Sequence, residues 1–87
     1  MDAEWLSSFK SKLDQHHSWP SLYIFKFIVP FEKVDELKSL FPQYPVSEKA
    51  SSKGRYVSIT MQVLANTSDS VIKIYELASK IEGVIAL

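Results

Sequence analysis

The chain has 87 residues, the length of a single domain. Its ten acidic and ten basic residues cancel, which argues against a dedicated nucleic-acid-binding protein because such proteins usually carry a basic surplus. Cysteine is absent, which excludes disulfides and cysteine-ligated zinc or iron–sulfur clusters. The acidic start does not resemble a signal peptide, and no apolar run reaches the roughly 20 residues that span a bilayer. We therefore expect a cytoplasmic protein that does not contact membranes.

The N-terminal segment predicts an amphipathic helix. Asp2 is placed to cap a helix that runs to about Gln15, and Pro20 then disfavours further helix at the residue before it. One stripe of this helix is apolar and consists of Trp5, Leu6, Phe9 and Leu13. We treat residues 1–17 as a helical extension and residues 18–87 as the domain that follows it.

A strand and a second helix come next. Residues 21–29 are rich in aromatic and branched side chains, which indicates a strand. Pro30 suits the first turn of a helix, where its missing N–H costs nothing, and Pro42 marks the end of that helix. The apolar positions between the two prolines repeat at helical spacing: Val34, Leu37, Leu40 and Phe41.

The second half predicts a hairpin, a third helix and a short strand. Residues 44–51 read as a weaker strand at a sheet edge, where Pro45 is tolerated, and Gly54 closes the turn into a strand that ends near Ala65. Asn66 or Thr67 can cap the next helix. Its apolar stripe consists of Val71, Ile74, Tyr75, Ala78 and Ile81. Lys80 falls in its last turn, Gly83 suits its C-cap, and residues 84–87 form a short terminal strand.

After the first helix, this order is β-α-β-β-α-β, and it predicts an α+β, ferredoxin-like fold. Right-handed crossovers place two helices on one face of a four-stranded antiparallel sheet, with the first and third strands in the centre. The helix-covered face is expected to carry Tyr23, Phe25, Phe27, Val57, Ile59, Met61 and Val63. The open face is expected to carry Ile24, Lys26, Ile28, Tyr56, Ser58, Thr60 and Gln62.

The apolar stripe of the N-terminal helix needs a partner, because an exposed apolar patch invites association. We expect Trp5 and Phe9 to lie on the open sheet face, against Ile24, Ile28 or Tyr56. Packing against a second copy, as in a homodimer, or against another protein remains open.

The stretch SSKGRYVSITMQVLA, followed by a helix with Tyr75 and a short apolar strand, resembles the YbeD-like family of small bacterial proteins. The matching turn consists of Ser51, Ser52, Lys53, Gly54 and Tyr56, and Phe25-Lys26-Phe27 resembles the family's first strand. The resemblance covers about residues 22–87. It implies a ferredoxin-like fold similar to the ACT regulatory domains of metabolic enzymes. Two departures are the long N-terminal helix and Val29-Pro30, which replaces the glycine common after the first strand.

A candidate site lies around the hairpin turn. Lys49, Lys53 and Arg55 cluster about Gly54, and a basic turn with unpaired backbone N–H groups can hold a carboxylate or phosphate. Ser52, Tyr56 and Lys26 complete the set of candidate ligand- or partner-binding residues. The alternative interpretation is a solvated hairpin turn, in which Gly54 supplies a positive φ.

Other chemistries have weaker signals. Two adjacent histidines, His16 and His17, lack the further ligands that a metal site needs, and no base is placed beside the serines of residues 47–53. Lys53-Gly54-Arg55-Tyr56 resembles an RNA-recognition strand, but that motif needs alternating aromatic residues and only Tyr56 qualifies. We therefore expect no enzyme, cofactor or metal, and no nucleic-acid partner. The main hypothesis is a noncatalytic regulatory or binding module for a protein partner or small anionic metabolite, and an RNA-binding module is the alternative.

Overall fold

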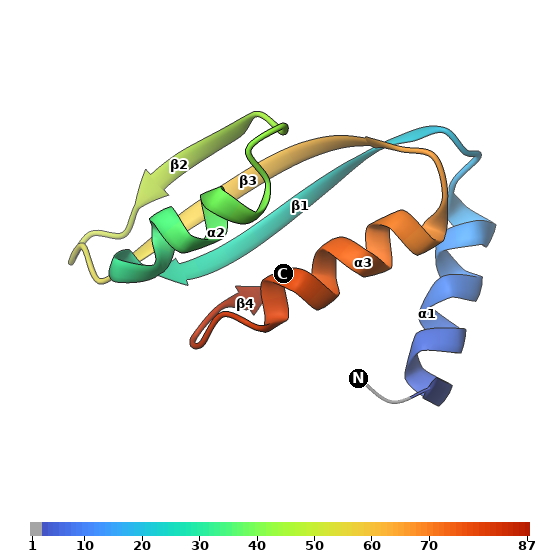
Figure 1. Cartoon of the computed structure of the whole chain (residues 1–87), viewed down its shortest axis with the longest axis horizontal. Helices are drawn as coiled ribbons and strands as arrows, with labels where there is room; N and C mark the ends of the chain where they lie inside the picture. Colours follow the sequence, from blue (N-terminus) through green and yellow to red (C-terminus); the bar gives the residue numbers. More distant parts are fainter. Residues whose placement is uncertain (1–2) are drawn as a thin grey trace.

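The computed structural model describes residues 3–87, in which three α-helices and a four-stranded sheet follow one another in the expected order (Figure 1). The elements are α1 (Ala3–His16), β1 (Ser21–Pro30), α2 (Val34–Leu40), β2 (Val46–Ala50), β3 (Tyr56–Ala65), α3 (Ser68–Ser79) and β4 (Ile85–Ala86). A 3-10 turn, Phe31–Lys33, joins β1 to α2. The expected cap Asp2 lies outside the described residues.

The sheet is antiparallel, and its strand order is β2-β3-β1-β4. β1 and β3 pair along their whole length, from Ser21 opposite Ala65 to Pro30 opposite Tyr56, which confirms them as the central strands. β4 pairs with β1 only at Phe27 and Ile28. The arrangement fits a ferredoxin-like fold in general.

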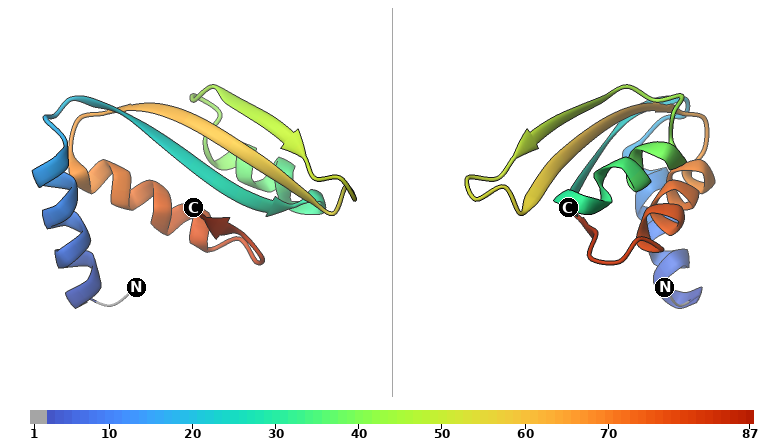
Figure 2. Two further views of the ribbon diagram at one scale, coloured as in Figure 1. Left: turned by 180° about the vertical axis from the view of Figure 1, so that it is seen from behind. Right: turned by 60° about the vertical axis from the view of Figure 1, so that its left-hand side comes forward.

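The core lies between the sheet and the helices α2 and α3, which cover the same face (Figure 2). Phe25, Phe27 and Val29 of β1 are at most 1% exposed. The β3 residues on the same face of the sheet are also buried: Val57, Ile59, Met61 and Val63. Because strand side chains alternate between faces, this burial confirms both predicted faces.

The prediction for α1 is wrong: this helix lies against α3 and not on the open sheet face (Figure 1). Leu13 is 5% exposed, whereas Ile24 and Tyr56 on the open face stay 50% and 45% exposed. The reason is that α3 offers both apolar and polar partners. The Phe9 ring meets the Tyr75 ring at a centroid distance of 5.7 Å, so the stripe packs within the helix layer, where Trp5 stays 49% exposed.

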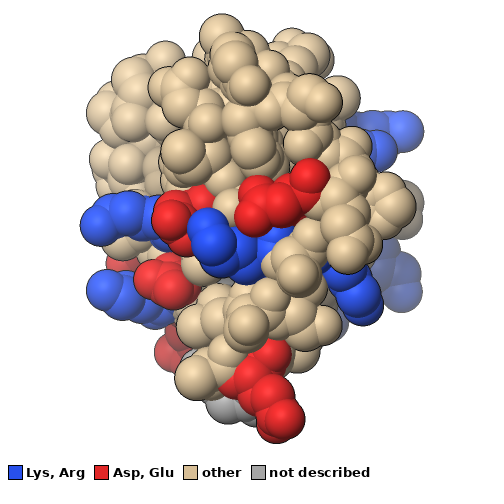
Figure 3. Space-filling view, turned by 90° about the vertical axis from the view of Figure 1, so that its right-hand side faces the viewer, with Lys and Arg blue, Asp and Glu red and all other residues tan. Residues whose placement is uncertain are grey.

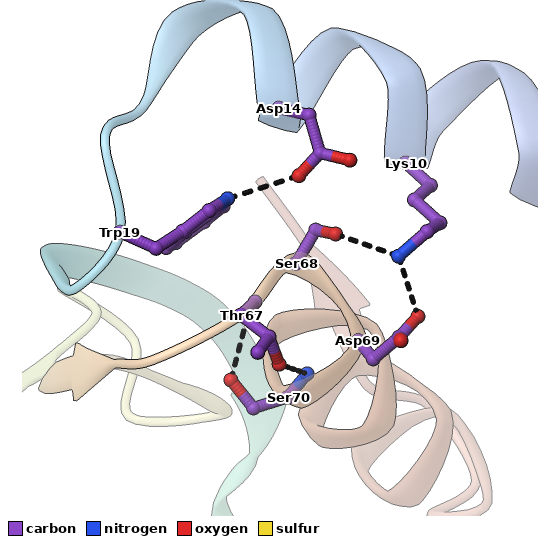
Figure 4. A network of polar contacts seen from close by, with 7 residues as sticks. All are labelled: Lys10, Asp14, Trp19, Thr67, Ser68, Asp69 and Ser70. Carbon is purple, nitrogen blue, oxygen red and sulfur yellow. Dashed lines mark hydrogen bonds and ion pairs between the residues drawn. The ribbon is translucent and has the colours of Figure 1, made fainter.

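Polar contacts fix the other end of α1 against the start of α3 (Figure 4). Lys10 Nζ donates to Ser68 Oγ and forms an ion pair with Asp69, each at 3.0 Å. Trp19 Nε1 donates to Asp14 at 2.9 Å, and this bond, the largest of several causes, lowers the pKa of Asp14. These bonds tie α1 and its connection to β1 to the N-terminal turn of α3.

The ends of α3 follow capping rules in part. Thr67 is the cap, and its hydroxyl accepts a hydrogen bond from Ser70 N at 3.1 Å. The helix ends at Ser79 with Lys80 as its C-cap, so Gly83 lies beyond the expected cap position, in the turn to β4 with φ +84°. Pro30 also differs from its prediction, because it ends β1 and stays extended (ψ 139°) before the 3-10 turn.

No helix within residues 3–87 combines the length and the apolar character that crossing a membrane requires.

Candidate functional site

The open sheet face is hollowed where the two edge strands flank the central pair. This open-face hollow has a volume of about 480 Å³, and residues of β1, β2 and β3 line it together with Leu87. The side chains that matter are Lys26 and Ile28 of β1, Ser58 and Thr60 of β3, and Ser47 and Lys49 of β2.

The strand register fixes how these side chains are arranged. In one row across the sheet, Lys26 lies opposite Thr60, which lies opposite Ser47. In the next row, Ser58 lies between Ile28 and Lys49. Since neighbouring strands are about 4.8 Å apart and the two rows are about 6.8 Å apart along the strands, the Cα atoms of Lys26 and Lys49 are about 12 Å apart, with two hydroxyls between them.

The two lysines carry unneutralised charge. The ion pairs among residues 3–87 are Lys10–Asp69, Lys33–Glu36 and Lys38–Glu48, and none involves Lys26 or Lys49. Glu48 also borders the hollow, but its carboxylate accepts a hydrogen bond from Lys38 Nζ of α2 at 2.7 Å, on the helix side of the sheet. That bond raises the pKa of Lys38. The hollow therefore favours a negatively charged ligand.

The predicted site residues divide into two groups. Lys26 and Lys49 meet in the open-face hollow, whereas Ser52, Lys53, Gly54, Arg55 and Tyr56 do not line it. The latter form the hairpin tip, where Gly54 has φ +72° and Ser51 Oγ accepts a hydrogen bond from Tyr56 N at 3.3 Å. Within the described chain, the side chains of Lys53 and Arg55 make no hydrogen bond or ion pair.

Sequence reasoning did not name Ser47, Ser58 and Thr60 as site residues. Ser58 and Thr60 were assigned to the open face by alternation, so their position beside Lys26 was available from the strand pattern. Ser47 could be placed only from the register of β2 on β3.

A second hollow lies on the helix side, beyond the end of β4. Trp5, Phe9, Tyr75, Ala86 and Leu87 line this aromatic hollow, which has a volume of about 230 Å³. Tyr75 is central to it: its hydroxyl lies 3.0 Å from that of Tyr23, and its ring meets that of Phe25 at a centroid distance of 4.9 Å. Burial, together with the bond to Tyr23, raises the pKa of Tyr75 well above its usual value.

The histidines lie away from both hollows. His16 ends α1, and the His17 ring lies near those of Trp19 and Tyr23, with its Nδ1 atom 3.1 Å from Ser21 Oγ. In the described part of the chain, no carboxylate forms a hydrogen bond with the other ring nitrogen of His17. We therefore assign His16 to the end of α1 and His17 to the connection between α1 and β1.

Charge is unevenly spread over the surface. Figure 3 shows blue and red side chains mixed across the middle and lower part of the α1 end, while the near side of the upper part is tan, with a more distant blue side chain at its right edge. The sequence agrees, because residues 15–25 and 56–68 contain no Asp, Glu, Lys or Arg. The open face thus has an uncharged end at Leu22 and Leu64, which lie opposite each other, and a basic end at the open-face hollow.

Comparison with known proteins places the chain. A profile of the family described as "Protein of unknown function (DUF493)" matches residues 14–87. The chain belongs to the DUF493 family. A curated relative, a "UPF0250 protein" of Shewanella piezotolerans (strain WP3 / JCM 13877), is 31% identical over 81 residues, which cover 85% of this chain and 92% of the relative. The DUF493 match confirms the YbeD-like resemblance, since these names describe one family. No solved structure matches the chain significantly.

Proposed function

We propose that this DUF493 protein is a noncatalytic, ACT-like binding module whose open sheet face takes a small anionic ligand. The observation that carries the proposal is the pair Lys26 and Lys49, which flank the hydroxyls of Ser58 and Thr60 in one hollow. A carboxylate or phosphate accepts hydrogen bonds from both ammonium groups and from the hydroxyls between them.

The ligand class follows from charge and size. Lysine presents a compact charge on a flexible stem, so two lysines whose Cα atoms are about 12 Å apart can close on one anion from opposite sides. Ile28 and Leu87 add apolar contacts at the same hollow. A small metabolite with one or two acidic groups and a short apolar part fits this lining.

Binding without catalysis is supported by what surrounds the hydroxyls. General-base activation of a serine or threonine needs a base within hydrogen-bond reach. The acidic side chain among the lining residues, Glu48, is held by Lys38, and both histidines lie at the opposite end of β1. Ligand binding is the role that this lining supports.

The open sheet face does not support the RNA-binding alternative. Stacking platforms on such sheets need aromatic residues at alternate outward positions of the central strands. Among the outward residues of β1 and β3, Tyr56 is the aromatic one, and it lies at the strand end outside the open-face hollow.

The test is a titration of the ¹⁵N-labelled full-length chain with inorganic phosphate, succinate and citrate. We expect the amide resonances of Lys26, Lys49, Ser58 and Thr60 to move first. The variant K26Q/K49Q should weaken binding by about tenfold or more, because two charge-assisted hydrogen bonds are lost.

The control is Lys53→Gln, which removes one basic side chain at the hairpin tip and should leave the affinity unchanged, whereas Lys26→Gln or Lys49→Gln alone should already weaken binding. Shifts confined to residues 53–56, with K53Q weakening binding instead, would move the site to the hairpin turn. An absence of shifts at the hollow with every anion, together with salt-sensitive retention on heparin, would favour the RNA-binding alternative.

A further inference from the structure

Half of β1 has no strand on its outer side. Phe31 N donates to Arg55 O at 2.9 Å toward β3, and Leu87 N donates to Lys26 O at 2.9 Å toward β4. Because backbone groups alternate along a strand, the N–H and C=O groups of Leu22 and Ile24 point to the same side as those of Lys26. Within residues 3–87, β4 pairs with β1 only at Phe27 and Ile28, so no strand lies opposite Leu22 and Ile24.

This β1 edge, residues 21–25, lacks the features by which proteins usually protect exposed strand edges. Charged side chains, prolines and bulges discourage strand addition. The opposite sheet edge differs in its charged side chains, since β2 carries Glu48 and Lys49. The β1 edge has no charged side chain, and both Leu22 and Ile24 are at least half exposed.

The aromatic hollow lies where an added strand would place side chains. A residue that continues the row of β4 opposite Phe25 would face the helix layer, as Ala86 does opposite Phe27. The Phe25 ring is in contact distance of Tyr75, and Tyr75 and Ala86 line the aromatic hollow together with Phe9. The side chain of that added residue would therefore enter the hollow.

We propose that the β1 edge binds an extended, uncharged segment of a partner protein as an added strand antiparallel to β1. The segment's backbone pairs with Leu22 and Ile24, and one of its apolar side chains fills the aromatic hollow. Backbone pairing of this kind gives affinity, while the pocket for an alternate side chain gives specificity. The uncharged surroundings of the edge select a neutral segment, because a buried unpaired charge is costly.

The test uses short peptides selected from a random displayed library on the full-length chain, then synthesised with capped ends. We expect enriched peptides to be uncharged and to alternate apolar residues, and to shift the amide resonances of Leu22 and Ile24. N-methylation of the peptide amides that face the edge should weaken binding about tenfold or more, and N-methylation of the alternate amides should change it less than about twofold.

A substitution in the protein, in place of a change in the peptide, tests the same β1 edge. Ile24→Pro removes an N–H that has no strand partner and should abolish peptide binding. Ala50→Pro removes an outward N–H on the opposite sheet edge and is the matched control, expected to bind normally. If Ile24→Pro does not fold, the N-methylated peptides decide the question on the unaltered protein.

Three results would overturn the proposal. One is that the selection enriches no peptide. Another is binding that is insensitive to the position of N-methylation or that shifts Ser58 and Thr60 instead. The third is protection of the Leu22 and Ile24 amides that rises with protein concentration as a dimer forms, because a second copy would then occupy the edge.

Discussion

Phe9 of α1 lies edge-on to Tyr75 of α3, with ring centroids 5.7 Å apart and an interplanar angle of 60°. This geometry is a favourable arrangement for two aromatic rings. It makes α1 a part of the helix layer, although residues 3–13 precede the segment that matches the family profile. The open sheet face is left uncovered by the described chain as a result.

The burial of Leu13 predicts how strongly α1 is held. Leu13→Ala should lower the free energy of unfolding by about 2–5 kcal/mol, because a fully buried leucine leaves a cavity. Urea denaturation measures the change. The control is Leu64→Ala on the exposed face, which should stay within about 0.5 kcal/mol of the original. Equal effects of the two variants would mean that α1 is not docked on α3 in solution.

The central pair Phe27 and Ile59 predicts the strongest effects in the sheet. They lie directly opposite each other, and each is 1% exposed. Either residue changed to alanine should cost about 2–5 kcal/mol of unfolding free energy. Thr60→Ala, on the other face of the same strand, is the control and should cost far less. Losses below about 0.5 kcal/mol at both core positions would show that the faces of the sheet are reversed.

The two glycines predict unequal costs for the same substitution. Both have positive φ, so alanine is strained at either position, by about 1–2 kcal/mol. A Cβ atom at Gly83 would also lie 2.8 Å from Pro30 Cγ, whereas one at Gly54 would meet no atom within 4 Å. Thermal unfolding should therefore show Gly83→Ala to be clearly more destabilising than Gly54→Ala. A larger effect at Gly54 would contradict the described approach of the β4 turn to Pro30.

Tyr75 predicts a loss of stability in alkali. Burial raises its pKa in the folded state, so the unfolded chain releases the phenolic proton at lower pH than the folded chain does. The contribution of the protonated Tyr75 side chain to stability is complete below the ordinary tyrosine pKa of about 10, and it is lost as the pH rises above that value. Tyr75→Phe should weaken this pH dependence and cost about 1 kcal/mol at neutral pH, through the lost bond to Tyr23. Denaturation curves between pH 7 and about 11 measure both effects; an unchanged pH dependence would contradict the buried position of the Tyr75 hydroxyl.

The sheet could be predicted because each of its long strands carries a period of two that alone assigns its faces. Phe25, Phe27, Ile59 and Met61 alternate with polar or exposed positions, so one face of the sheet buries them all. The place of α1 could not be predicted, because its stripe is compatible with any apolar surface within reach. The docking position of α1 depends on Tyr75. The sequence assigns this residue to the apolar stripe of α3 but does not show that its ring also contacts α1.

The candidate site was predictable to a similar extent. Alternation put Lys26, Ser58 and Thr60 on one face, but the sequence emphasised the basic hairpin tip because its charges are close together along the chain. The register of β2, which is set by pairing and not by composition, brings Lys49 beside Ser58 and away from Lys53. Proximity along the sequence thus gave too much weight to the hairpin tip as a binding site and too little to the open face of the sheet.

Leu87 lines both the open-face hollow and the aromatic hollow. If an anion occupies the first and a peptide side chain the second, both contact the same residue. Any preference that one ligand imposes on Leu87 then alters the affinity of the other by some factor, and thermodynamic reciprocity requires the same factor in reverse. A metabolite signal and a protein contact would be coupled through a single leucine, with no movement of the central strands.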